Sequence, residues 1–408
     1  MSSKRALIVG GSMGGLFAAN LLHRAGWEVT VLEKAASPLT SRGTGIVTND
    51  GLRKLLEMAG ARYAHELGYA LDERIAFDRE GKLLASCKLP QILTAWSRLL
   101  RILLDALPPE RYRLQSNVVT IDPGSANELA RVTLASGESL EAELLVAADG
   151  VRSIIRKQVF DAPPIEYAGY VAWRALVDRG TLSPETQALL GNAFAFSQAP
   201  GEQILGYPIL GADDAERVLI NVVWYRKTSA TQLNDMLTDI QGQLHADGIA
   251  PHLIRSEFIQ QARSDASILL HPAWAEVLAS SPELILQVIV DSTTTSMHKG
   301  RAALIGDAAF VARPHVGQGV TKAAGDALAL TQAFDGTEDD VLAALARFSA
   351  LRVPVGQFAV DQARRLGAVI QPYQAGFTSW VEHYAQPDNL IRDTAVELEG
   401  VAHLVRAH

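Results

Sequence analysis

The chain has 408 residues, of which 48% are hydrophobic and 20% are charged, and its formal net charge is −8. This composition is typical of a globular protein with two or three domains, and without a basic run it disfavours nucleic acid as a partner. Cys87 is the only cysteine, which excludes an internal disulfide and agrees with a reducing cytoplasm. We expect no signal peptide, no membrane span and, from ten scattered histidines, no metal site.

The first elements predict a dinucleotide-binding unit. Residues 7–9 and 29–32 are short apolar runs typical of buried parallel strands, and residues 13–25 between them predict a helix. The turn "GGSMGG" allows backbone N–H groups to face a pyrophosphate, and Glu33 at the end of the second run is placed to bind a ribose. The residues alone leave open whether the dinucleotide is NAD(P) or FAD.

The next part of the chain alternates short strands and helices. Residues 40–47, "TSRGTGIV", predict a loop, and residues 51–59 and 99–107 predict helices. Residues 62–95 alternate in polarity around Glu80 and Gly81, which indicates a hairpin. Three or more strands follow, and the last, "ELLVAADG", resembles a central strand that meets a ligand at its carboxyl end.

Between residues 165 and 290 the sequence becomes β-rich and aromatic, which predicts an antiparallel sheet with one helix at residues 231–245. Residues 302–305, "AALI", predict a return to the first sheet, followed by "GDAA". A helix is expected from residue 319, and the chain after residue 340 is largely helical, with Pro354 as a predicted break or kink.

Three motifs occur in order along the chain: "GGSMGG", "ADGVRSIIR" and "LIGDAAFVARPHVGQGV". With them the chain resembles the single-component FAD-dependent aromatic hydroxylases, built like para-hydroxybenzoate hydroxylase. The segments "YAGYVAWR", "YPI" and "HKGRAALIGDAA" are similar to those of family members that hydroxylate dihydroxypyridines. The resemblance implies that the first βαβ unit holds FAD, and that NADH or NADPH binds only transiently as a co-substrate.

The resemblance also implies an α/β fold with a Rossmann-type FAD-binding domain, an inserted β-rich substrate domain and a helical C-terminal region. The expected boundaries are residues 1–165 for the first part of the FAD-binding domain and 166–295 for the substrate domain. Residues 296–335 form the expected return segment with the GD motif, and residues 336–408 the helical region. The C-terminal tail is expected to pack on the body or on a partner subunit, as in a possible homodimer.

Cofactor-binding residues follow from the resemblance motif by motif. Glu33 is assigned to the ribose, Val119 to the adenine through its backbone, and Asp307 to the ribityl chain. Thr44, Gly45 and Ile46 are expected to run beside the isoalloxazine. Asp149 is expected near the pyrophosphate, where the nicotinamide docks, and the helix opened by "GQGV" faces flavin N1 and O2. The full set is Gly10, Ser12, Met13, Gly15, Glu33, Lys34, Arg42, Thr44, Gly45, Ile46, Arg98, Val119, Asp149, Asp307, Gly317, Gly319 and Val320.

Two positions depart from the family pattern. Many relatives have an arginine that opens the helix near residue 96 and contacts FAD, whereas this chain has Trp96, with Arg98 and Arg101 nearby. The usual histidine after "GDAA" is replaced by Phe310, and a histidine occurs instead at position 315. Which of the two arginines reaches the cofactor is left open.

The implied activity is a monooxygenase that uses NAD(P)H and O2 to hydroxylate a small hydroxylated N-heteroaromatic, dihydroxypyridine-like, or phenolic ring through a flavin C4a-hydroperoxide. Alternatives are epoxidation, Baeyer–Villiger oxidation, or a flavoprotein dehydrogenase or oxidase. An NAD-dependent dehydrogenase would use Glu33 without needing the DG and GD motifs. Candidate substrate residues are Tyr207, Trp224, Tyr225, Pro314 and His315, and His315 and Tyr207 are also the catalytic candidates. A base that takes the ring hydroxyl proton would assist the reaction, but the sequence does not identify it. Ordinary core packing is the alternative for each aromatic side chain.

Overall fold

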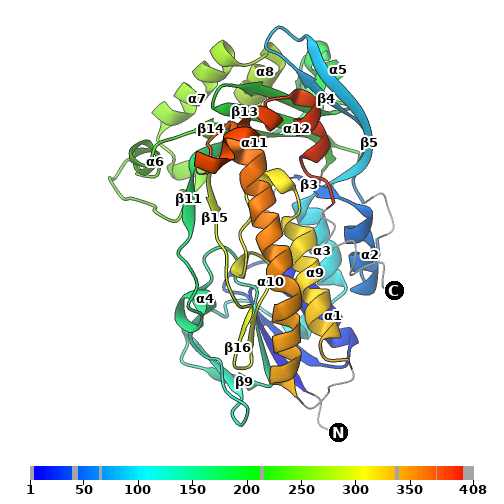
Figure 1. Ribbon diagram of the computed structural model, residues 1–408, viewed down its shortest axis with the longest axis vertical. Coiled ribbons are helices and arrows are strands. Elements are labelled where there is room, and N and C mark those ends of the chain that lie inside the picture. The colour runs from blue at the N-terminus through cyan, green and yellow to red at the C-terminus, as the bar shows by residue number, and fades with distance from the viewer. Residues whose placement is uncertain are drawn as a thin grey trace.

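The computed structural model describes residues 4–38, 45–63, 67–211, 216–335, 340–373 and 375–397. Within these ranges the strands form a six-stranded, an eight-stranded and a three-stranded sheet. The six-stranded and eight-stranded sheets lie toward opposite ends of an elongated molecule, and the long helix α10 (Val341–Leu366) runs between these ends (Figure 1). No helix in the described ranges is both long and apolar enough to span a bilayer.

The six-stranded sheet is the predicted dinucleotide-binding core. Its order is β16-β17-β10-β1-β2-β6, and its strands are parallel except for β16, which pairs antiparallel with β17. Apolar runs buried on both sides explain why the central strands read as continuous hydrophobic segments. The strands are β1 (Arg5–Val9), β2 (Glu28–Leu32), β6 (Tyr112–Arg113), β10 (Leu144–Ala147), β16 (His298–Lys299) and β17 (Ala302–Leu304).

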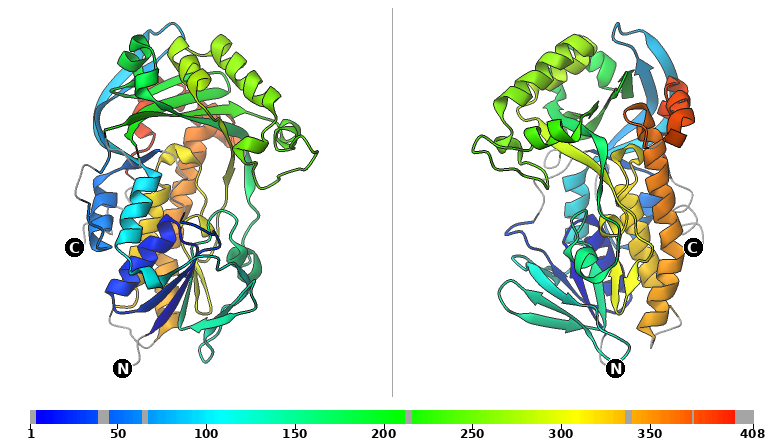
Figure 2. Two further views of the ribbon diagram at one scale, coloured as in Figure 1. Left: turned by 180° about the vertical axis from the view of Figure 1, so that it is seen from behind. Right: turned by 60° about the vertical axis from the view of Figure 1, so that its left-hand side comes forward.

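Helices and a small sheet cover this core. The first helix contacts both the third and the ninth, and the three-stranded antiparallel sheet adds its apolar side chains to the same buried cluster. Figure 2 shows the helices stacked beside the six-stranded sheet. The elements are α1 (Met13–Arg24), α2 (Asp50–Met58), α3 (Trp96–Asp105), α4 (Ile154–Val159), α9 (Gly319–Gln332), β7 (Val118–Asp122), β8 (Ala130–Leu134) and β9 (Ser139–Ala142).

The eight-stranded sheet has the order β15-β11-β14-β13-β12-β4-β5-β3, and only the β12–β4 pair is parallel. Because side chains alternate along each strand, the sheet has two distinct faces, and both are buried. The strands are β3 (Gly45–Thr48), β4 (Tyr69–Phe77), β5 (Leu83–Ala95), β11 (Glu166–Asp178), β12 (Phe194–Ala199), β13 (Glu202–Leu210), β14 (Val218–Lys227) and β15 (Ile285–Asp291).

Different helices cover the two faces. The outer face packs on α5 (Pro184–Leu190), α7 (Ser256–Leu269) and α8 (Pro272–Ser280), which lie on the side away from the six-stranded sheet (Figure 2). The inner face packs on the C-terminal chain, including α12 (Pro387–Asp393), which follows α11 (Thr378–Tyr384). The inner face is therefore the one that shares its surroundings with the rest of the chain.

The predicted α/β architecture with a second, β-rich sheet is present. Strands β3 to β5, which lie inside the proposed segment 1–165, pair with the eight-stranded sheet rather than with the first sheet. Alternating polarity predicts a half-buried strand but does not say which sheet the strand joins. The domain boundaries themselves remain a proposal.

Two helix predictions need correction. The helix expected at residues 231–245 is shorter, because α6 covers only Ala230–Met236. Helices α7 and α8 were not predicted at all. The buried side of α7 consists of Ala262 and Ala266, so its apolar stripe is weak.

Of the break or kink predicted at Pro354, the break is wrong, because α10 continues from Val341 to Leu366 through that residue. An interior proline costs about 3 kcal/mol, so packing must compensate for it. Buried side chains lie on both sides of the proline, among them Phe348 and Val360, and Gly356 fits closely against the ring of Phe310.

Candidate active site

The turn after β1 has the geometry of an anion cradle. Gly10 has φ +105°, and a Cβ there would lie 2.4 Å from the Ala148 carbonyl oxygen. A Cβ on Gly15 would lie 1.9 Å from the Gly10 carbonyl oxygen, so α1 and β1 approach as closely as glycine allows. Ser12 precedes α1 with an extended backbone and makes no side-chain capping bond to the described residues. The first N–H groups of α1 thus remain available to a phosphate.

Glu33 stands beside this turn at the end of β2. Its side chain is buried, and its carboxylate accepts hydrogen bonds from the backbone N–H groups of Gly11 and Ala35, each at 2.8 Å. Each carboxylate oxygen retains a further lone pair, so both can still accept ribose hydroxyls. Lys34 is exposed. Val119 lies in β7 with 41% of its surface exposed, and its carbonyl accepts from Gln158 Nε2 at 2.9 Å.

The DG and GD motifs meet at the same edge of the sheet. Strands β17, β10 and β1 are neighbours, so Asp307, Asp149 and Gly10 follow three adjacent carboxyl ends. In open α/β sheets, ligands bind at this edge. Arg156 links the two motifs, because its Nη1 donates to the Ala308 carbonyl at 3.3 Å and its Nη2 to the Val151 carbonyl at 2.7 Å.

Both aspartates lie in desolvated surroundings. Asp149 Oδ2 accepts from the Ile154 N–H at 2.8 Å, while Oδ1 is buried without a partner among the described residues. Burial raises the pKa of Asp149, and burial also raises that of Asp307, although the positive charge of Lys322 opposes the second shift. Such carboxyl groups fit a polar ligand that supplies the missing donors.

The segment "GQGV" opens α9. Gly317 has φ +60°, and a Cβ on Gly319 would meet nothing within 4 Å among the described residues. Gln318 Nε2, Thr321 Oγ1 and Lys322 Nζ are buried and have no hydrogen-bond partner in the part of the chain that the structure describes. Buried polar atoms are rarely left unpaired, so the first turn of α9 fits the polar edge of a bound cofactor such as a flavin.

Most of the predicted FAD residues thus lie around the carboxyl edge of the six-stranded sheet and the start of α9. Arg42 and Thr44 lie outside the described residues. Trp96 is the first residue of α3, as expected, and Arg98 and Arg101 are both engaged in interactions. The contact of each residue with FAD remains a prediction, as does the identity of the arginine.

Strand β3 brings the predicted flavin edge to the inner face of the second sheet. Gly45 lies against the Tyr207 ring, since a Cβ there would be 2.3 Å from Tyr207 Cε2. The Gly45 N–H also donates to Asn221 Oδ1 at 3.4 Å. Asn221 faces Tyr207 across the β13–β14 pair, so the segment that includes Ile46 starts directly beside this aromatic and polar surface.

Tyr225 belongs to the same face as Tyr207, because the two residues lie at alternate positions of the paired strands. Both are buried, and burial raises the pKa of Tyr207 to about 12. Arg174 on the neighbouring strand β11 lies close enough to both phenols to oppose their pKa shifts. The inner face therefore combines aromatic surface with a positive charge.

Trp224 does not belong to this face, which separates it from the other aromatic residues predicted to bind the substrate. It follows the opposite alternation and packs in the cluster beneath α7 and α8. Its Nε1 donates to Glu202 Oε2 at 3.0 Å, and the Arg226 guanidinium lies 4.4 Å from its ring centroid. Adjacent residues of a strand point to opposite faces, so Trp224 and Tyr225 cannot share one pocket.

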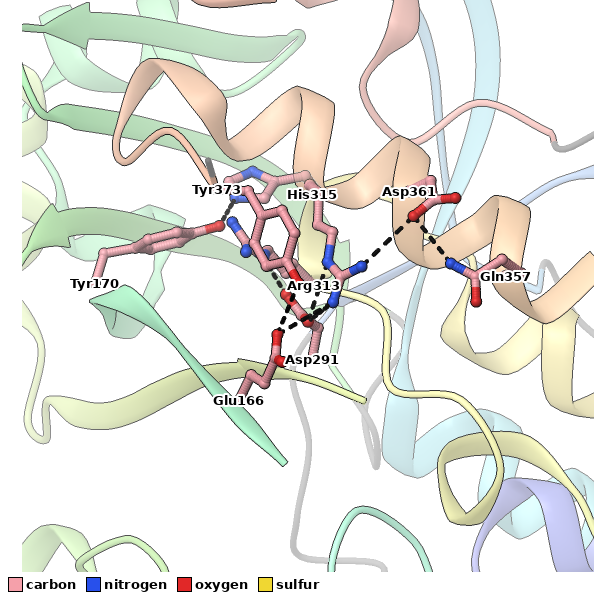
Figure 3. Close-up of polar contacts among 9 residues, drawn as sticks. Glu166, Tyr170, Asp291, Arg313, His315, Gln357, Asp361 and Tyr373 are labelled. Carbon is pink, nitrogen blue, oxygen red and sulfur yellow. Dashed lines mark hydrogen bonds and ion pairs between the residues drawn. The ribbon is translucent and has the colours of Figure 1, made fainter. Parts of the chain in front are cut away.

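His315 reaches the inner face from the other side. It lies in a 3₁₀ turn, Pro314–Val316, with 1% of its surface exposed, and its ring centroid is 4.3 Å from that of Tyr225. Its Nε2 is 2.8 Å from the Tyr170 hydroxyl (Figure 3), whereas Nδ1 has no partner among the described residues. Burial lowers the pKa of His315 to about 3, and the charge of Arg313 adds to this shift. At neutral pH the ring is uncharged and is a poor base.

A buried cluster of charged residues lies beside Tyr170 (Figure 3). Asp291 is fully buried and binds two arginines, with Arg313 Nε at 2.7 Å from Oδ2 and Arg364 Nη2 at 2.6 Å from Oδ1. Arg364 continues to Glu166 at 3.3 Å and lies 3.9 Å from the Tyr373 ring centroid. The cluster thus fixes Arg313 at the position from which its charge acts on His315 and Tyr170.

Sequence reasoning missed several polar residues of the inner face. Among the described residues, Gln203 finds no partner for either side-chain atom, and Asn221 Nδ2 and Arg174 Nε are also buried and unpaired. Tyr170 was missed as the partner of His315. Polar residues inside alternating β-rich segments were the available signal, but the signal became specific only when the strand register was known.

A dinucleotide-binding sheet whose carboxyl edge meets the inner face of a mixed β-sheet defines an FAD-dependent hydroxylase architecture. Residues 8–69 match a model for an NAD(P)-binding Rossmann-like domain, and residues 167–291 match one for an FAD binding domain-like family. The chain is 30% identical to 2,6-dihydroxypyridine 3-monooxygenase of Paenarthrobacter nicotinovorans over 83% of this chain and 84% of that enzyme. The chain belongs to the FAD-dependent monooxygenase family.

Two further similarities agree with this assignment. The FAD-dependent urate hydroxylase of Mycolicibacterium vanbaalenii is 26% identical over 97% of both chains. The solved structure of 2,6-dihydroxypyridine-3-hydroxylase from Arthrobacter nicotinovorans superposes with a TM-score of 0.83 at 25% identity, covering 91% of this chain and 93% of that one. The FAD-dependent hydroxylase fold and the use of FAD with NAD(P)H are therefore established for this protein.

Proposed function

We propose that this protein hydroxylates a small, hydroxylated N-heteroaromatic ring of the dihydroxypyridine type, with NAD(P)H and O2 as co-substrates. The observation that carries the proposal is the meeting of Gly45 with Tyr207 and Asn221, where the expected flavin edge adjoins an aromatic face with unpaired polar atoms. Two relatives named above act on nitrogen heterocycles, a dihydroxypyridine and urate. We take this chemistry as the guide to the substrate.

The cofactor site is assigned to residues that the geometry makes suitable. The glycine turn and the start of α1 would hold the pyrophosphate, Glu33 the ribose, and Asp307 the ribityl chain. Gly317 and the start of α9 at Gly319 would face the pyrimidine edge of the flavin. When bound, FAD supplies the redox chemistry that joins NAD(P)H oxidation to oxygen insertion.

The protein residues orient the ring and keep it dry. Tyr207 and Tyr225 offer two buried aromatic surfaces, and Arg174 offers a guanidinium whose Nε has no partner in the described ranges. A ring with oxygen and nitrogen atoms at its edge satisfies such groups better than an apolar ring, because unpaired buried polar atoms each cost about 1–3 kcal/mol. Excluding water from this face favours productive oxygen transfer over loss of peroxide.

The test is NAD(P)H oxidation by the purified flavoprotein, with O2 uptake and peroxide followed, in the presence and absence of 2,6-dihydroxypyridine. We expect stimulated oxidation, little peroxide and a product one oxygen heavier. A matched phenol, resorcinol, serves as the control for the ring nitrogen. Stimulation by resorcinol alone would move the substrate class to phenols, and peroxide without product would make the compound an effector rather than a substrate.

A further inference from the structure

His315 carries a buried ring nitrogen that nothing in the described chain satisfies. Its Nε2 is occupied by the Tyr170 hydroxyl at 2.8 Å, but Nδ1 has no partner among the described residues. The imidazole ring packs on the ring of Tyr225. The backbone of the same residue is also fixed, because the His315 carbonyl accepts a hydrogen bond from the Ala395 N–H at 3.0 Å. An unsatisfied buried nitrogen destabilises the folded protein by about 1–3 kcal/mol, and a bound ligand that supplies the missing hydrogen-bond partner would remove this cost.

The neighbours of Tyr170 decide which nitrogen carries the proton. The positive charge of Arg313 acts on Tyr170, and the Arg313 guanidinium carbon lies 5.5 Å from the Tyr170 ring centroid. A nearby cation favours the orientation in which the phenol oxygen turns its lone pairs toward the guanidinium and its O–H away from it. Among the described residues, the hydrogen-bond partner of this hydroxyl is His315 Nε2, so the O–H donates to that nitrogen. If Nε2 accepts, the neutral imidazole must carry its proton on Nδ1.

A second proton on the ring is disfavoured by its surroundings. The positive charge of Arg313 lies beside the ring, while Tyr170 and Tyr225 face it from β11 and β14 as neutral phenols. Both carboxylate oxygens of Asp291 are bound by arginines, Oδ2 by Arg313 and Oδ1 by Arg364. The ring is therefore a neutral donor at Nδ1, and the two nitrogens of an imidazole point in divergent directions, so Nδ1–H points away from Tyr170.

We propose that Tyr170, backed by Arg313, holds His315 as the Nδ1–H tautomer and that this N–H donates to an oxygen atom on the bound ring. For the identity of that oxygen the inference rests on the proposed function. His315, one of the two catalytic candidates, is then a substrate-binding donor rather than a general base, and Tyr170 is a positioning residue.

The chemical consequence follows from the charge of the bound substrate ring. A donor aimed at a ring oxygen stabilises the oxygen more when it is ionised, so it favours loss of the hydroxyl proton. Ionisation raises the electron density of the ring carbons, which is what an electrophilic oxygen transfer requires. The hydroxyl proton passes to bulk water before the ring enters the buried site, so the protein selects the ionised, reactive form of the substrate without a residue that itself takes up the proton.

The tautomer can be measured without any substrate. In protein labelled with ¹⁵N-histidine, the NMR shifts separate protonated from unprotonated ring nitrogens, and His315→Asn identifies the signals of this residue. We expect Nδ1 protonated and Nε2 unprotonated from pH 5.5 to 8.5 in the wild-type protein, and a mixture or the opposite tautomer in Tyr170→Phe. An Nε2–H tautomer, or a doubly protonated ring, in the wild type would overturn the proposal.

The donor role is tested by the binding of 2,6-dihydroxypyridine, followed through the perturbed flavin spectrum of the holoenzyme. His315→Asn keeps an N–H group close to the position of Nδ1, whereas His315→Leu fills similar space without a donor. We expect the dissociation constant to change less than about threefold in the first variant and to rise about tenfold in the second, the effect of one hydrogen bond. His298→Asn, in β16 of the other sheet, is the matched control and leaves binding unchanged.

The outcomes separate this inference from the proposed function. Equal weakening in His315→Asn and His315→Leu would sink the donor role, and so would loss of FAD in place of loss of ring binding. If the wild-type holoenzyme fails to bind 2,6-dihydroxypyridine, the proposed substrate is wrong, and the inference is then judged by the NMR tautomer and by repeating the Asn and Leu comparison with uric acid.

Discussion

The two sheets differ in how they build their part of the site. At the carboxyl edge of the six-stranded sheet, the backbone shapes the site, since Gly10 and Gly15 allow close backbone approaches that a Cβ atom would prevent. At the inner face of the eight-stranded sheet, side chains such as Tyr207, Arg174 and Gln203 decide what can bind. Substitutions in the first region should therefore act on FAD, and those in the second on the substrate.

The largest expected effect tests the backbone region. In Gly15→Ala the new Cβ would collide with the Gly10 carbonyl, which cannot move away within the strand-to-helix turn. We expect FAD affinity to fall at least about 30-fold, from a strain of about 2–4 kcal/mol. Gly14→Ala is the matched control, because its Cβ would make an ordinary 3.4 Å contact with Ala323. The measurement is the flavin absorbance per protein after purification. Equal FAD content in the two variants would contradict the prediction.

The next effect tests the side-chain region. Arg174→Met removes the guanidinium near Tyr207 and Tyr225 while keeping much of the side-chain volume. We expect FAD to stay bound and the KM for 2,6-dihydroxypyridine to rise about 10-fold to 100-fold, the effect of a lost charged hydrogen bond. Arg226→Met changes an arginine of the adjacent strand that points to the outer face, where it pairs with Glu202 and Asp265. An equal KM change in both variants would contradict the distinction between the faces.

A third prediction concerns how the buried His315 beside the inner face makes the free energy of unfolding depend on pH. The pKa of His315 is about 3 in the folded protein and about 6.5 when unfolded, so the unfolded state binds the extra proton between these values. The free energy of unfolding should therefore fall as the pH drops below about 6.5. Between pH 7 and 5, we expect the wild type to lose about 1–2 kcal/mol more than His315→Asn in urea titrations. Parallel pH profiles would contradict a buried neutral histidine.

The smallest effect concerns Trp224, which packs on the outer face of the eight-stranded sheet. Trp224→Phe removes the indole bond to Glu202 and should lower the free energy of unfolding by about 1 kcal/mol. We expect the KM for 2,6-dihydroxypyridine to remain within about twofold, because the side chain lies on the outer face. Tyr225→Phe, one residue further and on the inner face, provides the contrast. A KM change in the Trp224 variant that equals that of the Tyr225 variant would restore Trp224 to the pocket.

Much of the first region was predictable from sequence. The strand, glycine turn, helix and Glu33 occur close together in the chain, and α1, β1 and β2 lie where the pattern placed them. Local steric rules make such a pattern informative, because few residue types tolerate the turn at Gly10. The second region was less predictable, since Trp224 and Tyr225 read alike in the sequence and differ only in the face that they occupy.

The sequence by itself determined the class of the fold, the cofactor-binding turn and the family to which the chain belongs, because these depend on short-range backbone geometry and ordered motifs. Tertiary structure alone decided that β3 to β5 join the second sheet, that α10 continues through Pro354, and that Arg313 and Tyr170 meet His315. Strand register and the packing of distant segments fix these features, and with them the burial that sets the protonation of His315.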